Sequence, residues 1–460
     1  MKFKSIIIII LISNIISEPE EDLVKDLPDY PFEKKMYSGY LNITEIKKLH
    51  YIYLESENDS DKLFIWFNGG PFCSSLNGWI KGHGPFVIEG NKLVKNPYSW
   101  NKLANMLYIE SPAGTGFSIL NSSKEEDFET NDNITAKENL IGLIDFYNKF
   151  PSLRDKDLYI SGESYAGIYI PMLAYEILNY NDKVSDDKDK INLKGIMIGN
   201  AYTDKKYEEY YAIIDYSFSH GLLSYEIRKD FLQNCINEFN QTLCMDNLNK
   251  TSLILLKLNM YDYLRDKDND ILNSENNNFY FNFERWRFPK NLQSKQKNFL
   301  QELNNEKFIS RSSFTTNYQK EYLNKIEVKK ALHVKENINW ESCSTLYYYY
   351  DQKNEGSIIY YPYLLGKIKI LIYSGDTDIM VPINGSLNWI RNLKLKIIDK
   401  WQSWKGKNLN GTEEDNKISG FRMKYEGLSF VSFKGIGHMV VEWDRKNSLY
   451  MIDQFLKDEF

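Results

Sequence analysis

The sequence predicts an α/β fold, with a mostly parallel central sheet flanked by helices and a largely helical cap insertion. Three observations predict it. Short, strongly apolar runs end abruptly in Gly, Ser or Asn, helix-like patterns lie between them, and one long charged stretch interrupts the alternation. Runs this apolar are typical of strands buried on both faces, as in a parallel or mixed sheet covered by helices.

The expected strands are Leu63–Phe67, Met106–Ile109, Leu158–Ile160, Ile196–Ile198, Ile370–Tyr373 and Leu428–Phe433, and the expected helices include Ala136–Phe150 and Ala166–Tyr180. Each of the first five strands stops at polar or glycine-rich residues. Because chemistry in such folds lies at the carboxyl ends of the strands, these residues mark the expected active site.

Residues 205–325 break this alternation. The stretch is more charged than its surroundings and contains Asn276-Asn277-Asn278. We interpret it as a cap over the active edge of the sheet, inserted between a first core part at 18–204 and a second core part at 326–460.

The charge balance argues against two classes of partner. The chain has 57 Lys+Arg against 63 Asp+Glu and a formal net charge of −6. A mildly acidic chain without a basic block is not expected to bind nucleic acid or an anionic membrane surface as its main partner.

Residues 1–17 are expected to form a signal peptide. Lys2 and Lys4 precede the apolar stretch Ile6–Ile16, and Ser17 supplies a small residue before an acidic run. The stretch is too short to span a bilayer but suits a signal-peptide core, although a signal anchor is the alternative. After its removal we expect no membrane span, and a destination in the secretory pathway, either lysosome or vacuole or the exterior.

Secretion allows disulfides, and the four cysteines permit three pairings. Cys235 and Cys244 are close in sequence and would close a small loop, which leaves Cys73 with Cys343. We expect no metal site and no cofactor, since there is no CxxC and no nearby His pair. Sequons for N-glycosylation start at Asn42, Asn58, Asn121, Asn133, Asn240, Asn249, Asn384 and Asn410.

Ser164 is the candidate nucleophile. It lies in Gly162-Glu163-Ser164-Tyr165-Ala166-Gly167, between an expected strand and an expected helix. A serine at such a sharp turn holds its hydroxyl out over the sheet edge, and small neighbours are needed because the backbone folds tightly around it. An ordinary turn serine is the alternative for this motif taken alone.

The order of the chain narrows the choice of acid and base. A serine nucleophile on this fold is followed first by the acid and then by the histidine. Asp376 follows the strand Ile370–Tyr373, and His438 is the one histidine of five that comes after it. We therefore expect Asp376 to orient His438, and His438 to act as general base and acid for Ser164.

Five sequence blocks, in order, resemble motifs of the serine carboxypeptidase family of carboxypeptidase Y and lysosomal cathepsin A. Residues 68–75 (NGGPFCSS) resemble NGGPGCSS, and residues 110–118 (ESPAGTGFS) resemble the block around SPAGVGFS. Residues 162–167 match GESYAG, residues 375–382 resemble the acid loop, and residues 435–439 (GIGHM) resemble GAGHM. The resemblance covers nearly the whole mature chain and implies an α/β-hydrolase fold.

The resemblance also implies roles for residues around the triad. The backbone N–H groups of Gly70 and Tyr165 would form the oxyanion hole. Asn68, Gly69 and Glu163 stand where the family grips the terminal carboxylate of its substrate, and Met439 could line the pocket for the leaving residue. In the family a long-range disulfide joins the cysteine of the first block to a later cysteine after a tryptophan. This again implies Cys73 with Cys343, which follows Trp340.

Two departures bear on function. Phe72 replaces the second glycine of GGPG, and a positive φ there would strain it by about 1 kcal/mol or more. Gly82 replaces a glutamate that, in the family, pairs with the one at 163 to hold the substrate carboxylate. We hypothesise that Lys81 or His83 takes over this binding; the alternative is that both face solvent.

The expected function is therefore release of C-terminal residues from peptides and proteins through an acyl-enzyme on Ser164. Two alternatives stay open. The same triad could serve an acyltransferase or esterase, or the chain could be a catalytically weak family member that acts as a binding protein.

Overall fold

The computed structural model describes residues 18–237, 240–266, 317–344, 347–348, 356–409 and 417–460. The expected signal peptide, Asn276-Asn277-Asn278 and the sequon at Asn410 lie outside the described residues.

An 11-stranded mixed sheet forms the core, with strand order β1-β2-β6-β3-β9-β10-β12-β15-β14-β13 and with β7 beside β2. The central strands are β6 (Asn105–Ile109), β3 (Lys62–Phe67), β9 (Asp157–Glu163), β10 (Leu193–Gly199), β12 (Lys369–Gly375) and β15 (Leu428–Phe433). Each is parallel to its neighbours within this set. The outer strands are β1 (Met36–Asn42), β2 (Lys47–Leu54), β7 (Ile119–Leu120), β13 (Ile397–Trp404) and β14 (Gly420–Tyr425), and they pair antiparallel. The prediction of a mostly parallel sheet is confirmed, and every expected strand lies in it.

The strands are apolar throughout because both faces of the sheet are covered. In β3, Leu63, Ile65 and Phe67 belong to one core cluster, whereas Phe64 and Trp66 belong to the cluster on the opposite face. Successive side chains of a strand point to opposite faces, so a strand between two helical layers needs an unbroken apolar run.

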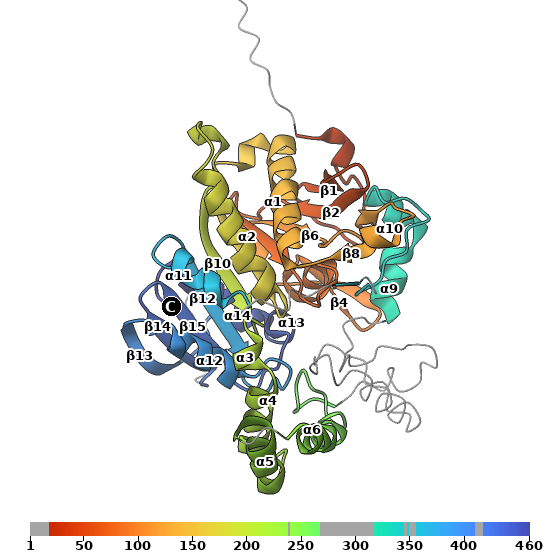
Figure 1. Cartoon of the computed structure of the whole chain (residues 1–460). Helices are drawn as coiled ribbons and strands as arrows, with labels where there is room; N and C mark the ends of the chain where they lie inside the picture. The colour runs from red at the N-terminus through yellow and green to blue at the C-terminus, as the bar shows by residue number, and fades with distance from the viewer. Residues whose placement is uncertain (1–17, 238–239, 267–316, 345–346, 349–355, 410–416) are drawn as a thin grey trace, which may run out of the picture.

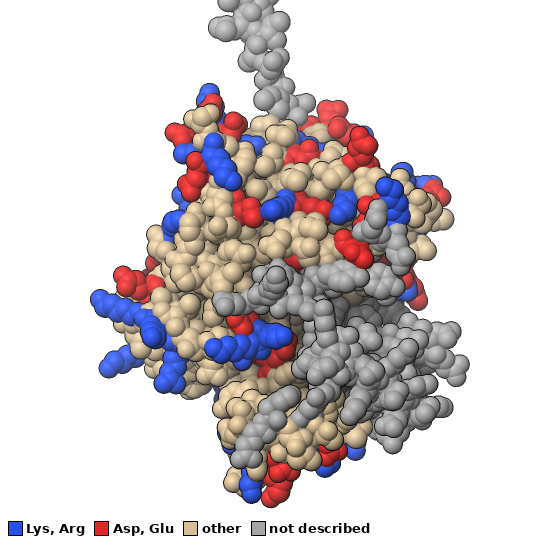
Figure 2. Space-filling model, viewed as in Figure 1, with Lys and Arg blue, Asp and Glu red and all other residues tan. Residues whose placement is uncertain are grey.

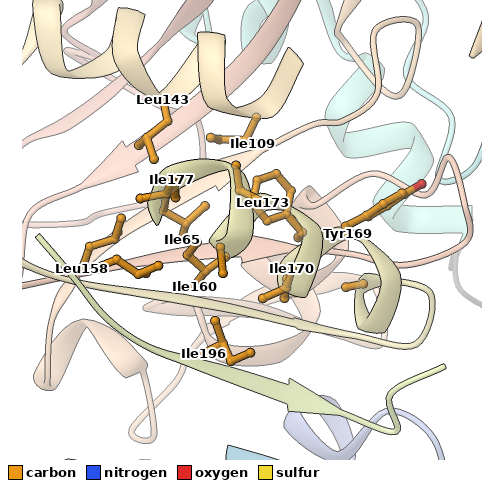
Figure 3. Close-up of a cluster of buried hydrophobic side chains, with 14 of the residues drawn as sticks. Ile65, Ile109, Leu143, Leu158, Ile160, Tyr169, Ile170, Leu173, Ile177 and Ile196 are labelled. Carbon is orange, nitrogen blue, oxygen red and sulfur yellow. The ribbon is translucent and has the colours of Figure 1, made fainter. Parts of the chain in front are cut away.

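Helices α1 (Asp132–Lys149), α2 (Ala166–Asn181), α11 (Tyr361–Leu364) and α12 (Ile383–Asn392) cover the first face, and Figure 3 shows the packing of α1 and α2 on it. The other face is covered by α14 (Arg445–Leu456), α9 (Asn317–Asn324) and α10 (Ile326–Ala331). The observed α1 starts four residues before the expected helix, because the Asn131 side chain caps it by accepting from the Ile134 N–H at 3.0 Å.

The first part of the insertion is helical, as predicted. It contains α3 (Lys205–Glu208), α4 (Tyr210–Ser219), α5 (Tyr225–Phe231) and α6 (Gln241–Leu255), and Figure 1 shows α4, α5 and α6 projecting below α3 and α12. Their apolar side chains form a small cluster of their own, which also takes in Ile379 from the loop after β12. The division into 18–204, 205–325 and 326–460 stays a prediction; α9, which falls in the expected cap, buries Tyr322 and Leu323 in the core.

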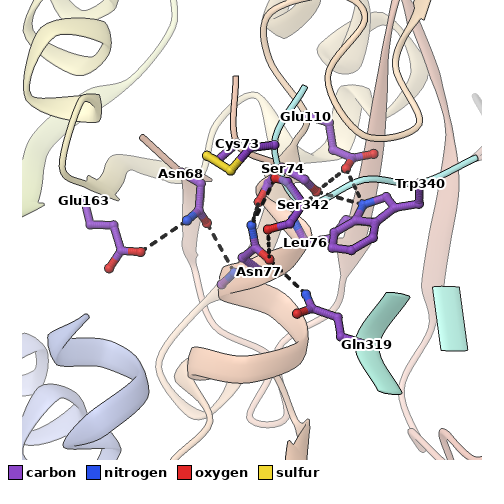
Figure 4. Close-up of a disulfide and its surroundings, with 12 residues drawn as sticks. Asn68, Cys73, Ser74, Leu76, Asn77, Glu110, Glu163, Gln319, Trp340 and Ser342 are labelled. Carbon is purple, nitrogen blue, oxygen red and sulfur yellow. Dashed lines mark hydrogen bonds between the residues drawn. A yellow bond between two sulfur atoms is a disulfide. The ribbon is translucent and has the colours of Figure 1, made fainter. Parts of the chain in front are cut away.

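Both predicted disulfides are present, Cys73–Cys343 and Cys235–Cys244. Around the first, the Ser74 N–H donates to the Ser342 carbonyl at 2.7 Å. The two segments therefore lie side by side, and Figure 4 shows the polar side chains that surround the bridge.

On the face shown in Figure 2, Lys and Arg are interspersed with Asp and Glu. Among the described residues, no helix combines the length and apolarity that a membrane crossing requires.

Candidate active site

Ser164 occupies a tight turn between β9 and α2, as its motif predicts. Its φ is +61°, which is uncommon for a residue other than glycine and is typical of strained functional turns. The turn is held by backbone hydrogen bonds: the Ser164 N–H donates to Gly199, and the Ser164 carbonyl accepts from Gly167 and Tyr202, each at 2.9 Å. These backbone hydrogen bonds therefore hold Ser164 in its unusual conformation.

The glycine loop after β3 packs directly against this turn. A Cβ on Gly69 would lie 2.5 Å from the Tyr165 backbone nitrogen and 2.7 Å from the Ser164 Cβ, so only glycine allows the approach. Gly70 follows with a φ of +123°. The two residues predicted to supply oxyanion donors, Gly70 and Tyr165, thus lie on two loops in contact beside Ser164.

His438 lies in the loop after β15, where its ring is 1% exposed. Its Nδ1 is 2.6 Å from Oδ2 of Asp378, which is fully buried. Within the described residues, the buried Nε2 has no hydrogen-bond partner. A carboxylate on Nδ1 fixes the proton there and leaves Nε2 as the nitrogen that can accept one.

The prediction that Asp376 orients His438 is wrong. Asp376 Oδ1 instead accepts from the Gly435 N–H at 2.6 Å, and its carbonyl accepts from the Tyr216 hydroxyl. β12 ends at Gly375, so Asp376 lies at the point where the chain turns and meets the backbone of the histidine loop. Asp378, two residues further along the loop, reaches the imidazole. Burial raises the pKa of Asp376, and the Gly435 N–H opposes that rise.

Asn200, at the end of β10, is a site residue that sequence reasoning missed. Its Nδ2 donates to Asp378 Oδ2 at 2.8 Å, and its Oδ1 accepts from the Gly375 N–H at 3.1 Å. The preceding residue, Gly199, binds the Ser164 N–H. The end of β10 therefore joins the serine turn to the His438–Asp378 pair. The abrupt stop of that apolar run at Asn200 was the available signal.

Glu163 and Asn68 meet beside the serine turn (Figure 4). Asn68 Nδ2 donates to Glu163 Oε1 at 3.2 Å, and Asn68 Oδ1 accepts from the Trp66 indole N–H at 2.7 Å. Because the indole can only donate, it fixes the orientation of the Asn68 amide and aims its NH₂ at Glu163.

Burial raises the pKa of Glu163 to about 7, with nearby Glu442 adding to the rise and His438, Lys81 and the Asn68 hydrogen bond opposing it. The pKa of His438 is also raised: burial lowers it, but Asp378 and Glu163 outweigh the burial. The site thus holds a carboxyl group with a pKa of about 7 beside a histidine whose pKa is raised.

Neither Lys81 nor His83 faces solvent. His83 is fully buried, its ring stacks on Trp100 at 4.3 Å, and burial lowers its pKa to about 3. It is part of the aromatic core and does not carry the charge that a carboxylate needs. Lys81, only 7% exposed, forms an ion pair of 3.1 Å with Glu442. Glu442 therefore introduces a carboxylate, also missed from the sequence, near the position that Gly82 leaves without one.

Phe72 stands where the family motif has glycine, and its φ is positive, at +73°. Its side chain is 2% exposed. Its carbonyl accepts from the Ser344 N–H at 2.9 Å, next to the Cys73–Cys343 bridge. Strain of this kind costs about 1–3 kcal/mol and persists only where the surroundings hold it. Here the disulfide-linked segments hold the residue.

Met439 directly follows His438 and is 5% exposed.

In the part of the chain that the structure describes, no group of three or more His, Cys, Asp or Glu side chains could hold a metal ion.

The sequence profile of the serine carboxypeptidase family matches residues 28–458. The chain is also similar to two proteins from Arabidopsis thaliana over most of their length. Serine carboxypeptidase-like 21 is 31% identical over 493 residues, which cover 96% of this chain and 95% of the relative. Serine carboxypeptidase-like 35 is 33% identical over 458 residues, which cover 95% and 91%.

Among solved structures, the chain resembles that of Kex1(delta)p, a prohormone-processing carboxypeptidase from Saccharomyces cerevisiae. The TM-score is 0.74 at 23% identity, over 96% of this chain and 97% of the other. This likeness bears on the fold alone, and together with the mostly parallel sheet it confirms the expected α/β-hydrolase architecture.

Proposed function

Because the chain belongs to the serine carboxypeptidase family, we propose that it releases C-terminal residues from peptides and proteins through an acyl-enzyme on Ser164. The Ser164 hydroxyl attacks the last peptide carbonyl while Nε2 of His438 takes its proton. The N–H groups of Gly70 and Tyr165 stabilise the negative charge that develops on the carbonyl oxygen. His438 then gives the proton to the leaving amino acid, and water releases the acyl group by the reverse sequence.

One observation carries this proposal: the buried 2.6 Å contact between His438 Nδ1 and Asp378 Oδ2, with Nε2 left without a partner among the described residues. A buried histidine whose second nitrogen is unpaired needs an explanation, because such groups are normally satisfied. A general base held ready for the Ser164 hydroxyl explains it. The end of β10 supports the assignment, because Gly199 accepts from the Ser164 N–H and Asn200 donates to Asp378.

The C-terminal carboxylate of the substrate would bind at Asn68 and Glu163, with Lys81 close enough to affect the charge of Glu163. When Glu163 is protonated it can donate a hydrogen bond to that carboxylate. Lys81 brings a positive charge, paired with Glu442, next to Gly82, which carries no carboxyl group itself. We therefore keep Lys81 as the candidate that binds the substrate carboxylate. His83 is excluded from this role because it is fully buried.

Lys81→Met is expected to raise KM for peptides with a free C-terminal carboxylate about tenfold or more, since a charged hydrogen bond contributes about 1.5–3 kcal/mol. KM for the corresponding ester or C-terminal amide should change little. The measurement is steady-state hydrolysis of matched peptide acid, amide and ester substrates. Lys47→Met is the matched control, because it removes another Lys–Glu pair, Lys47 of β2 with Glu138 of α1 at 2.7 Å. Equal KM changes for all three substrates would contradict a role in carboxylate binding.

The pH dependence should differ between these substrates. With the pKa of Glu163 near 7, a rise in pH ionises this carboxyl group, which then repels the substrate carboxylate. The value of kcat/KM for peptide acids should therefore fall above about pH 7. Esters without that carboxylate should show only the acidic limb, where His438, with its raised pKa, becomes protonated and cannot act as base. Glu163→Gln should abolish the alkaline limb for peptide acids; an alkaline limb of equal size in esters would contradict the assignment.

Acyl transfer to an acceptor other than water is the second candidate. The motivating observation is Gly82, which packs against Val441 and offers no carboxyl group to pair with Glu163. Product analysis separates the two functions: free acid as the only product supports hydrolysis, whereas a conjugate formed with an added amine or alcohol supports transfer.

We also propose that the protein follows the secretory pathway to a lysosome-like compartment or to the exterior. The two disulfides support this, because such bonds persist in oxidising compartments. Mass spectrometry of the secreted protein, before and after deglycosylation, tests the seven sequons within the described residues and the expected cleavage after Ser17.

A further inference from the structure

One segment of the insertion lies between the two loops that carry Asp378 and His438. We call Met260–Arg265 the cap strap. The Met260 carbonyl accepts from the backbone N–H groups of Ile379 and Met380 at 2.9 and 3.1 Å, in the loop that carries Asp378. The next carbonyl, that of Tyr261, accepts from the His438 N–H at 2.7 Å. Two adjacent peptide groups of the strap thus bind both loops.

The buried side chain of Asp262 binds the strap to the loop that carries Asp378. Asp262, 1% exposed, accepts from the Thr377 hydroxyl at 2.7 Å through Oδ1 and from Arg265 Nε at 3.0 Å through Oδ2. The Tyr263 N–H returns a bond to the Thr377 carbonyl at 3.2 Å. Both oxygens of the carboxylate are used, and removal of either partner would leave a buried charge less well paired.

The same interaction extends to the histidine loop. The Arg265 guanidinium lies over the Trp443 ring, 4.6 Å from its centroid, and Trp443 belongs to α13 (Val440–Trp443), which follows His438. A Cβ on Gly437 would lie 2.1 Å from the Tyr261 carbonyl oxygen and 2.5 Å from the Asp262 Cβ. The residue before His438 therefore has to be glycine for the loop to reach the strap.

These contacts lie on both sides of the proposed acid, Asp378, and at the proposed base, His438. Asp378 lies between Thr377 and Ile379, both bonded to the strap, and His438 is bonded to it directly. The side chain of Asp378 reaches His438 over 2.6 Å, so a shift of either loop changes that distance. Displacements of about 1 Å caused by changes outside the reacting groups can lower a rate about 10²-fold.

We propose that the cap strap positions the Asp378–His438 pair and that Asp262 is a positioning residue for the reaction, acting through Thr377 and Arg265 rather than on the substrate. This inference rests on the proposed function, because it assigns His438 and Asp378 the roles of base and acid. The insertion was expected to cover the site. In this proposal it also holds two of the three reacting residues, Asp378 and His438, in place.

The test compares Asp262→Ala with Asp262→Asn and Asp215→Ala in hydrolysis of a small ester. Asp262→Ala should lower kcat about 10²-fold with little change in KM, because the strap acts on the reacting groups. Asp262→Asn keeps an oxygen for the Thr377 hydroxyl and should recover most of that loss. Asp215→Ala is the matched control: it removes another Asp–Arg pair of the insertion, Asp215 with Arg228 at 2.7 Å, which touches neither loop. Equal losses in Asp262→Ala and Asp215→Ala, or a change in KM alone, would overturn the proposal.

Amide hydrogen exchange of the same proteins separates failure of this inference from failure of the proposed function, since it requires no turnover. Asp262→Ala should speed exchange at 377–380 and 437–439, and Asp215→Ala should not. If the wild-type protein hydrolyses no substrate but these amides lose protection, the strap stands and the proposed function fails. If protection in Asp262→Ala equals that of the wild type, the inference fails whatever the turnover.

Discussion

Ser164→Ala is expected to lower kcat for peptide and ester substrates by about 10⁶, the size of loss seen when a triad nucleophile is removed. In the proposed mechanism this hydroxyl forms the acyl-enzyme, and no neighbouring side chain replaces it on the same turn. Substrate binding should persist, because Asn68 and Glu163 keep their contact. Steady-state kinetics and equilibrium binding of a peptide acid measure the two effects separately.

Ser161→Ala is the matched control for this variant. Ser161 lies on the same strand, is buried, and donates to the Ile65 carbonyl at 2.7 Å. Its loss removes a hydroxyl from β9 without touching the reacting groups, so kcat should change little. Activity of Ser164→Ala near that of the wild type would refute the acyl-enzyme on Ser164.

Asp378→Asn is expected to lower kcat by about 10⁴, because the amide can present a donor to Nδ1 and so favours the wrong imidazole tautomer. It would also disturb the contact with Asn200, which donates to the same oxygen at 2.8 Å. KM should change far less than kcat, since Asp378 is fully buried and lies behind the histidine. The measurement is kcat for an ester and for a peptide acid.

Asp376→Asn is the matched comparison two residues away. Its side-chain oxygen can still accept from the Gly435 N–H, the contact that Asp376 makes at 2.6 Å, so we expect a small effect on kcat. The reverse order of effects, with Asp376→Asn far more damaging than Asp378→Asn, would restore the assignment drawn from the sequence.

The fold was largely predictable because its strands are buried on two sides. A short, unbroken apolar run such as Leu63–Phe67 is typical of a central strand. In the structure its side chains alternate between the two hydrophobic clusters on opposite faces of the sheet. The tight turn at Ser164 was predictable from a local motif, and His438 was chosen because it is the one histidine after Asp376. The pairing of Cys73 with Cys343 followed from the small loop that the other two cysteines close.

The acid could not be chosen from the sequence alone. Asp376 and Asp378 stand in one motif, and the choice depends on where β12 ends and how the next residues turn toward His438. The Lys81–Glu442 pair and the cap strap were equally hidden, because each joins segments far apart in the chain. Such contacts follow from packing, and no local pattern encodes them.

The His83 hypothesis failed for a related reason. Its place beside Gly82 suggested the substrate site, but alternate residues of that turn face different surroundings. His83 stacks between the rings of Trp100 and Tyr108, whereas Lys81 reaches Glu442. Proximity in sequence to the missing glutamate therefore could not separate the two side chains: His83 is excluded, and the role of Lys81 stays a proposal.

Stoichiometric labelling with a serine-directed phosphonate, read by peptide mass spectrometry, tests the central claim most directly. The claim is that Ser164, His438 and Asp378 form a working triad. We predict one phosphonyl group per chain on Ser164, no labelling of Ser164→Ala, and much slower labelling of Asp378→Asn than of Asp376→Asn. An unlabelled Ser164 in the folded wild-type protein would contradict the claim and favour a binding protein built on the same fold.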